Sequence, residues 1–208
     1  MLAVEELILS DELFMGMGGQ QKTFIHPTDP SKCVIIAYAY NGVNRDLKKE
    51  LRYRKVCADS LKNSRLITKY FGEVSTNLGT GYVYERVRDF NGNTSQDLSK
   101  FLENMSNDAE SLKIVETLLL GFKEDFLREC IVTGDKTTTN FMVQETAPGV
   151  YQVRIVDNIG TPVWIPLVYY FKFVAEWRAR RLWNIWADEL IKNFPQLVLP
   201  ELVEKLRA

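Results

Sequence analysis

The sequence predicts an α+β protein with two lobes, the second of them minimal. Segments rich in β-branched and aromatic residues lie mainly in the first 88 residues, around one amphipathic helix. Residues 89–208 consist mostly of longer segments with apolar residues at helical spacing, and these enclose one short β-hairpin. We therefore expect a sheet-based domain over residues 1–88 and a mostly helical domain over residues 89–208.

The first domain begins with two strands around a glycine-rich turn. The apolar run Leu13–Met15 leads into Gly16, Gly18 and Gly19, and a second strand continues to Ile25. Because glycine lets the backbone approach a ligand closely, the N–H groups of such a turn can face phosphate oxygens. An ordinary hairpin turn has the same pattern, so both interpretations stay open at this point.

A buried strand and a helix come next. Cys33–Tyr38 is a continuous apolar run, and Val43–Leu61 carries apolar residues at helical spacing. Glu50 lies at the margin of that apolar face, where its carboxylate would either pair with a cation inside the fold or lie in water. Two further strands, Ile67–Val74 and Gly81–Val87, complete the predicted sheet.

The second domain is predicted to be mostly helical. Ser95 is a candidate cap for a short helix that ends near Met105, and a longer helix covers Asp108–Cys130. An aromatic helix is expected over Leu167–Leu190, and a last short helix over Glu201–Arg207. We interpret the aromatic residues of the penultimate helix as core, because each can bury a large apolar area.

A hairpin in the second domain brings polar side chains together. Phe141–Val143 and Tyr151–Val156 are rich in β-branched and aromatic residues, and turn residues separate them. Asp135 and Asn140 precede the first strand, and Asp157 follows the second. Antiparallel pairing would bring two acids and an amide to one place, which suits a divalent metal ion on phosphate oxygens. The alternative is a pair of ordinary turns, where Asp and Asn are common.

Composition and charge narrow the classes of function. The 208 residues carry a net charge of −1 and no Lys/Arg-rich block, so a nucleic-acid partner is not expected. Three scattered cysteines and a single histidine lack metal-ligand spacing and favour a reducing compartment. No signal-peptide pattern is evident and no apolar run is long enough for a membrane span, so we expect a cytoplasmic protein.

The hairpin and its flanking residues resemble a known fold. The spacing Asp135-x-x-x-x-Asn140, followed by the hairpin and Asp157-x-x-Gly160, resembles the catalytic and metal-binding loops of protein kinases. With every segment in order, the chain resembles the YrbL family of bacterial proteins, which is linked to the PhoP regulatory network and shares the protein-kinase-like fold. The resemblance rests on His26-Pro27-x-Asp29-Pro30-Ser31-x-Cys33, Lys49-Glu50-Leu51-x-Tyr53, Gly79-Thr80-Gly81-Tyr82-Val83-Tyr84, Ile131-Val132-Thr133, Asp157-Asn158-Ile159-Gly160 and Ile165-Pro166-Leu167.

The resemblance implies an ATP-dependent phosphotransferase that acts on a hydroxyl group. Asp135 would accept the proton of the attacking hydroxyl, and Asn140 and Asp157 would hold Mg²⁺ on the ATP phosphates. Protein Ser/Thr is slightly preferred as the acceptor. A small-molecule hydroxyl is the alternative acceptor, because the short segment after Gly160 leaves little surface on which a peptide could bind.

The same resemblance places the nucleotide in the first domain. Gly16, Gly18 and Gly19 would cover the phosphates. Glu85 and Val87 would lie where the hinge between the lobes bonds the adenine edge. The expected cofactors are therefore ATP and Mg²⁺.

One position departs from the kinase pattern. The resemblance places a phosphate-binding lysine on the middle strand, oriented by Glu50, and the aligned residue is Ile35. Without that lysine, Glu50 has no evident cation. Three interpretations are open: a pseudokinase that binds a partner without catalysis, replacement of the lysine by Lys22 on the neighbouring strand, or an isoleucine introduced to inactivate the protein.

Overall fold

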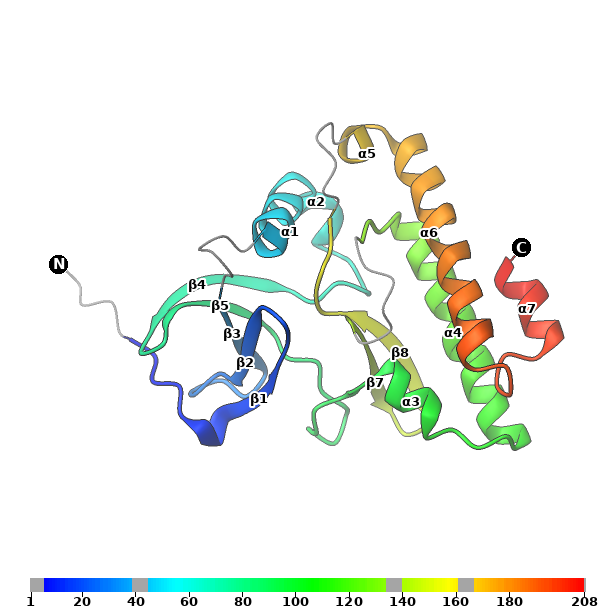
Figure 1. The fold of residues 1–208 in the computed structure, drawn as a ribbon, viewed down its shortest axis with the longest axis horizontal. Coiled ribbons are helices and arrows are strands. Elements are labelled where there is room, and N and C mark those ends of the chain that lie inside the picture. Colours follow the sequence, from blue (N-terminus) through cyan, green and yellow to red (C-terminus); the bar gives the residue numbers. More distant parts are fainter. Residues whose placement is uncertain (1–5, 39–44, 134–139, 161–166, 208) are drawn as a thin grey trace.

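The computed structural model describes residues 6–38, 45–133, 140–160 and 167–207. It has a sheet-based lobe on one side and a helical lobe on the other, with a β-hairpin where the two meet (Figure 1). This arrangement confirms the predicted α+β class, and the elements follow one another in the predicted order.

The first lobe is built on a five-stranded antiparallel sheet in the order β1-β2-β3-β5-β4. Each strand forms from one of the predicted apolar segments. The strands are β1 (Phe14–Met17), β2 (Gln21–Ile25), β3 (Lys32–Ala37), β4 (Tyr70–Thr76) and β5 (Gly79–Glu85), and a short 3₁₀ turn (Asp11–Leu13) precedes the first.

The two faces of this sheet pack against different groups. Val34 and Ile36 on β3 belong to one buried cluster, with Phe24. Ile35, which lies between them, belongs to another cluster with Tyr84. Because successive side chains of a strand point to opposite faces, the position predicted for the lysine faces away from the Val34 cluster.

The helix predicted over residues 43–61 is broken into two pieces. Helix α1 (Arg45–Val56) and helix α2 (Ala58–Leu61) meet at Cys57. The chain then joins the second lobe directly, since Ile67 bridges to Ile155 and the N–H of Ile155 donates to the Leu66 carbonyl at 2.7 Å.

The second lobe combines helices with a three-stranded sheet in the order β6-β7-β8. Phe122 is central to its core, since its ring centroid lies 5.5 Å from that of Phe141, 5.4 Å from Trp183 and 4.8 Å from Trp186. The elements are β6 (Gln96–Asp97), α3 (Leu98–Glu103), α4 (Ala109–Glu129), β7 (Phe141–Ala147), β8 (Val150–Ile155), α5 (Leu167–Tyr170), α6 (Lys172–Asn193) and α7 (Pro200–Arg207).

The cap predicted for the short helix was wrong. Helix α3 is capped by Asp97, whose carboxylate accepts the N–H of Lys100 at 3.0 Å. Ser95 instead donates its hydroxyl hydrogen to Oδ1 of Asp89 at 2.6 Å. The two-residue strand β6 pushes the helix start past Ser95, which is why the capping pattern misplaced it.

The aromatic residues of the helix predicted over Leu167–Leu190 were expected in the core, and this prediction was right for only some of them. Trp183 is buried, whereas Phe173 and Trp177 are 70% and 59% exposed. The buried side of the first turns of α6 is occupied by Ala175 and Ala179, so the aromatic residues there lie on the opposite side. Within the described part of the chain, no helix is long and apolar enough to cross a bilayer.

Candidate functional site

Two adjoining cavities lie where the five-stranded sheet, α1 and the β7–β8 hairpin meet. The smaller, which we call the polar chamber, has a volume of about 250 Å³. The larger, which we call the hinge chamber, has a volume of about 500 Å³. Ile35, Tyr84 and Asp157 are among the residues that line both, so the two chambers form one continuous cleft.

The polar chamber brings together most of the residues predicted to handle phosphate and metal. Gly18 and Gly19 line it from the glycine-rich turn, Glu50 from α1, and Asn140 and Asp157 from the two ends of the hairpin. The predicted juxtaposition of Asn140 and Asp157 is therefore observed. Asp135, the predicted proton acceptor, lies outside the described residues.

The hinge chamber contains the residues predicted to contact adenine. Gly16 lines it from β1, and Glu85–Val87 line it where β5 leaves the sheet. Met15 and Met142 contribute apolar surface on either side. A flat apolar ring with hydrogen-bonding edges would suit such a space.

The structure does not bring Lys22 into the cleft. It is exposed on β2 and pairs in register with Ile36. Its neighbours Gln21 and Thr23, which point to the other face of the strand, are the ones that line the cleft. The idea that Lys22 replaces the missing lysine therefore has no geometric support.

Asp157 is held in place by hydrogen bonds with Gln21, Asn158 and Glu50. The Gln21 side chain donates to its Oδ2 at 2.8 Å, and the backbone N–H of Asn158 donates to its Oδ1 at 2.6 Å. Burial raises the pKa of Asp157, and the hydrogen bonds with Asn158, Gln21 and Glu50 offset part of that rise. Lys49 of α1 contacts the Asn158 side chain, so the helix also holds the loop that carries the acid.

Glu50 pairs with a cation of its own helix instead of a strand lysine. It is 3% exposed, and its Oε1 lies 2.8 Å from Nε of Arg54, one helical turn further along α1. Burial raises the pKa of Glu50, while Arg54 lowers it and the charge of Asp157 raises it further. The i, i+4 spacing of a glutamate before an arginine was the signal that could have identified this pair.

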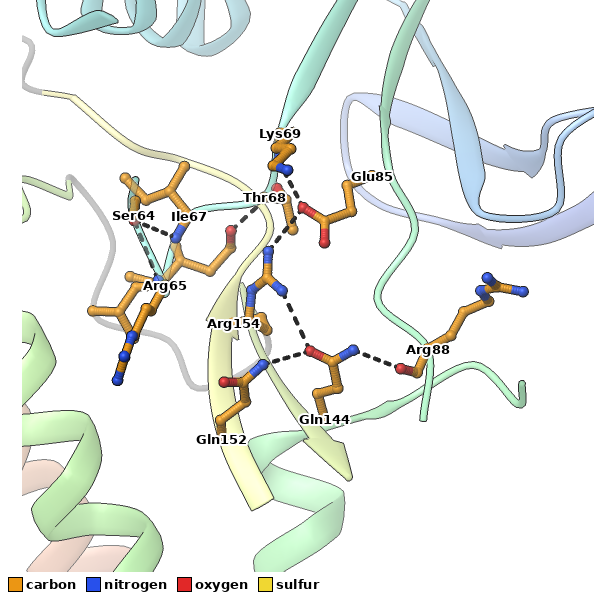
Figure 2. A network of polar contacts seen from close by, with 12 residues as sticks. Ser64, Arg65, Ile67, Thr68, Lys69, Glu85, Arg88, Gln144, Gln152 and Arg154 are labelled. Carbon is orange, nitrogen blue, oxygen red and sulfur yellow. Dashed lines mark hydrogen bonds and ion pairs between the residues drawn. The ribbon is translucent and has the colours of Figure 1, made fainter. Parts of the chain in front are cut away.

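The carboxylate of Glu85 is directed to the hairpin rather than to a ligand. Arg154 on β8 pairs with it at 2.8 Å and also donates to Gln144 at 3.3 Å. Figure 2 shows how Gln144 continues this network, accepting from Gln152 and donating to the backbone carbonyl of Arg88. The backbone N–H of Glu85 donates to the Lys69 carbonyl at 2.9 Å, so at this edge of the hinge chamber Glu85 has its own carbonyl to offer a ligand.

The oxygen donors of the polar chamber fit a metal ion that is shared with a phosphate. Among the described residues, no group of three or more His, Cys, Asp or Glu side chains could hold a metal ion alone. Asn140 and Asp157 supply an amide and a carboxylate oxygen in one cavity. Mg²⁺ is commonly held by one or two carboxylates, with water and substrate phosphates completing its shell.

The fold and the cleft together define a two-lobed α+β protein with an acid and an amide opposite a glycine-rich turn. The chain belongs to the family described as PhoP regulatory network protein YrbL, which matches residues 7–192. Proteins described as uncharacterized protein YrbL, from Escherichia coli strain K12 and from Shigella flexneri, are each 31% identical over 177 residues, covering 85% of this chain and 84% of the relative.

A crystal structure of a kinase domain also aligns with the chain. The TM-score is 0.44 at 13% sequence identity, and the alignment covers 74% of this chain. The chain spans about half of that kinase-domain chain, with 52% of it covered.

Proposed function

We propose that this protein is an ATP-dependent phosphotransferase of the protein-kinase-like superfamily that phosphorylates a hydroxyl group. The observation that carries the proposal is the meeting of Asn140 and Asp157 in one chamber with Gly18 and Gly19. An acid and an amide that can hold Mg²⁺ on phosphate oxygens, beside a glycine-rich turn that lets the phosphates approach closely, suit phosphoryl transfer.

Each part of the cleft has a role in this proposal. The hinge chamber takes the adenine ring, and the backbone of Glu85–Val87 bonds its edge. The polar chamber takes the phosphates, and Asp157 and Asn140 hold the metal there. Bound Mg²⁺ would neutralise charge on the transferred phosphoryl group. Asp135 would accept the proton of the acceptor hydroxyl, a role assigned from its spacing to Asn140 alone.

The family description places relatives of this chain in the PhoP regulatory network. Phosphorylation of a protein Ser or Thr is the acceptor chemistry that suits a regulatory role best, because a phosphate adds charge and three strong acceptor oxygens. A small-molecule hydroxyl is the other acceptor that we retain.

One observation favours a second function, a regulatory binding module without catalysis. Among the described residues that line the polar chamber, none is lysine or arginine, and Ile35 occupies the expected lysine position. A charge-assisted hydrogen bond to phosphate contributes about 2 kcal/mol. Its loss alone would lower a rate by roughly thirtyfold.

Transfer of labelled γ-phosphate from ATP distinguishes the two functions. The wild-type protein is incubated with Mg²⁺ and ATP, and label on the protein or release of ADP is measured alongside Asp135→Asn and Asp157→Asn. Turnover by the wild type that both variants lose supports the phosphotransferase. Absence of turnover in the wild type, with or without nucleotide binding, supports the binding module and contradicts the phosphotransferase.

A further inference from the structure

Helix α1 contains a buried ion pair, of which the acidic partner, Glu50, lines the cleft. The side chains of Glu50 and Arg54 are only 4% and 9% exposed, and Nε of Arg54 lies 2.8 Å from Oε1 of Glu50. Charges removed from water to this extent are retained when they are paired and hydrogen-bonded. The pair is therefore a defined part of the structure, unlike an exposed pair on a helix surface.

Arg54 also contacts two other elements of the first lobe. Its Nη1 donates to the backbone carbonyl of Thr68 at 2.8 Å. Its guanidinium lies 5.1 Å from the centre of the Tyr84 ring, and Tyr84 in turn hydrogen-bonds Glu50. The N–H of Thr68 donates to Ile155 of the hairpin, so Arg54 ties α1 to the place where the two lobes join.

We propose that Arg54 takes over the role of the absent strand lysine as the cation that positions Glu50. The carboxylate of Glu50 lines the polar chamber next to Asp157, while Arg54 lies behind it and does not line the chamber. The α1 side of the cleft is thus assembled without a lysine at position 35. Arg54 is a positioning residue for Glu50. Its expected effect on nucleotide binding rests on the proposed function.

This arrangement also determines the form of nucleotide that the chamber accepts. A lysine at position 35 would place a positive charge at the chamber wall, whereas the charge of Arg54 stays on the far side of a carboxylate. The described lining of the polar chamber contains three carboxylates: Asp46, which pairs with Lys49 at 3.2 Å, and Glu50 and Asp157, which hydrogen-bond each other. This lining therefore favours ATP that carries Mg²⁺ over metal-free ATP.

A double-mutant cycle, measured by melting temperature without nucleotide, tests whether Arg54 stands in for a lysine at position 35. We call it the melting cycle. Arg54→Met is expected to lower the melting temperature by roughly 10 °C, because it leaves Glu50 buried without a partner. Ile35→Lys should also destabilise, because the new ammonium meets a carboxylate that is already paired. The double variant should have a higher melting temperature than Arg54→Met, because the introduced ammonium would then pair with Glu50. A double variant whose melting temperature falls by the sum of the two single losses, or by more, overturns the proposal. Arg52→Met, on the exposed side of the same helix, is the matched control and should not change melting.

Calorimetric binding of Mg²⁺-ATP, and of ATP with EDTA, tests the nucleotide part. Arg54→Met should bind Mg²⁺-ATP about tenfold more weakly than the wild type, and Arg54→Lys, which keeps the charge, should recover part of that loss. Ile35→Lys, alone or combined with Arg54→Met, should bind metal-free ATP more tightly than the wild type does. If Arg54→Met binds Mg²⁺-ATP with wild-type affinity, this inference is overturned but the proposed function is not. If the wild type does not bind Mg²⁺-ATP, the nucleotide part of the inference and the proposed function are both overturned. The melting cycle then tests the ion pair by itself.

Discussion

The side-chain amide of Gln21 donates a hydrogen bond of 2.8 Å to Oδ2 of Asp157, although 136 positions separate the two residues in the chain. The carbonyl of Gln21 also accepts the N–H of Gly18 at 2.8 Å. One residue therefore closes the glycine-rich turn and contacts the acid proposed to bind the metal. The two halves of the proposed phosphate site are linked through Gln21.

Replacing Gln21 should separate these halves. Gln21→Ala removes a hydrogen bond to a carboxylate, so the free energy of unfolding should fall by about 1.5 kcal/mol. Urea denaturation measures this loss. Gln20→Ala is the control, because Gln20 contributes its backbone carbonyl to Tyr38, which the substitution keeps. Equal stability of Gln21→Ala and the wild type would show that the bond does not hold the turn.

The Arg154–Glu85 pair should stabilise the junction between the lobes. Both side chains are largely buried, with 11% and 24% exposed, and they lie 2.8 Å apart. Arg154→Met leaves the Glu85 carboxylate without its cation, so the free energy of unfolding should be about 3 kcal/mol lower than that of the wild type. Denaturant unfolding curves test this.

Arg88→Met is the matched control for Arg154→Met. Arg88 contributes its backbone carbonyl to the network, and Figure 2 shows its side chain pointing away from Gln144. Its substitution should change stability by less than about 0.5 kcal/mol. Equal losses in the two variants would mean that general charge, and not the pair with Glu85, stabilises the junction.

Close packing at Gly81 should make this position intolerant of a side chain. A Cβ atom there would lie 2.6 Å from Cγ1 of Val34 and 2.9 Å from Cγ2 of Thr76. Gly81→Ala should therefore destabilise the sheet by about 2 kcal/mol. Gly121→Ala on helix α4, where a Cβ would meet nothing within 4 Å, should instead stabilise by about 1 kcal/mol. Thermal denaturation of both variants checks the opposite signs, and stabilisation by Gly81→Ala would contradict the packing of β5 on β3.

Alkaline pH should destabilise the protein through Cys33. Burial raises the pKa of the Cys33 thiol from 9.0 to about 12. Below pH 9 both the folded and the unfolded chain keep the proton, but above it the unfolded chain loses the proton first. The free energy of unfolding should therefore fall as pH rises, by about 1.4 kcal/mol per pH unit from this thiol. Cys33→Ala should show a shallower fall between pH 9 and 11, and identical slopes would exclude Cys33 as the cause.

Much of the fold was predictable because its signals are local. The strands around Gly16 and Gly79 and the hairpin that turns at Gly149 follow from β-branched runs and turn residues. The long helix α4 follows from its apolar stripe and its cap at Asp108. The exposed aromatic residues at the start of α6 could not be predicted, because which side of a helix is buried depends on what packs against it.

The site was predictable where chain order alone brings residues together. Asn140 and Asp157 meet because they flank one hairpin. The contacts of Gln21 with Asp157 and of Arg154 with Glu85 join segments far apart in the sequence, so no local pattern indicated them. Lys22 was proposed from its proximity to Ile35, and strand alternation directs it to the wrong face.

The most direct test of the cleft is the melting temperature with and without millimolar Mg²⁺-ATP. The wild type should be stabilised, by about 3 kcal/mol when ligand exceeds its Kd a hundredfold, and Asp157→Ala should abolish the shift. Arg52→Met, at an exposed position of α1 that lines neither chamber, should keep it. No shift in the wild type, or an equal shift in Asp157→Ala, would contradict the claim that Asn140 and Asp157 hold a metal-bound nucleotide opposite the glycine-rich turn.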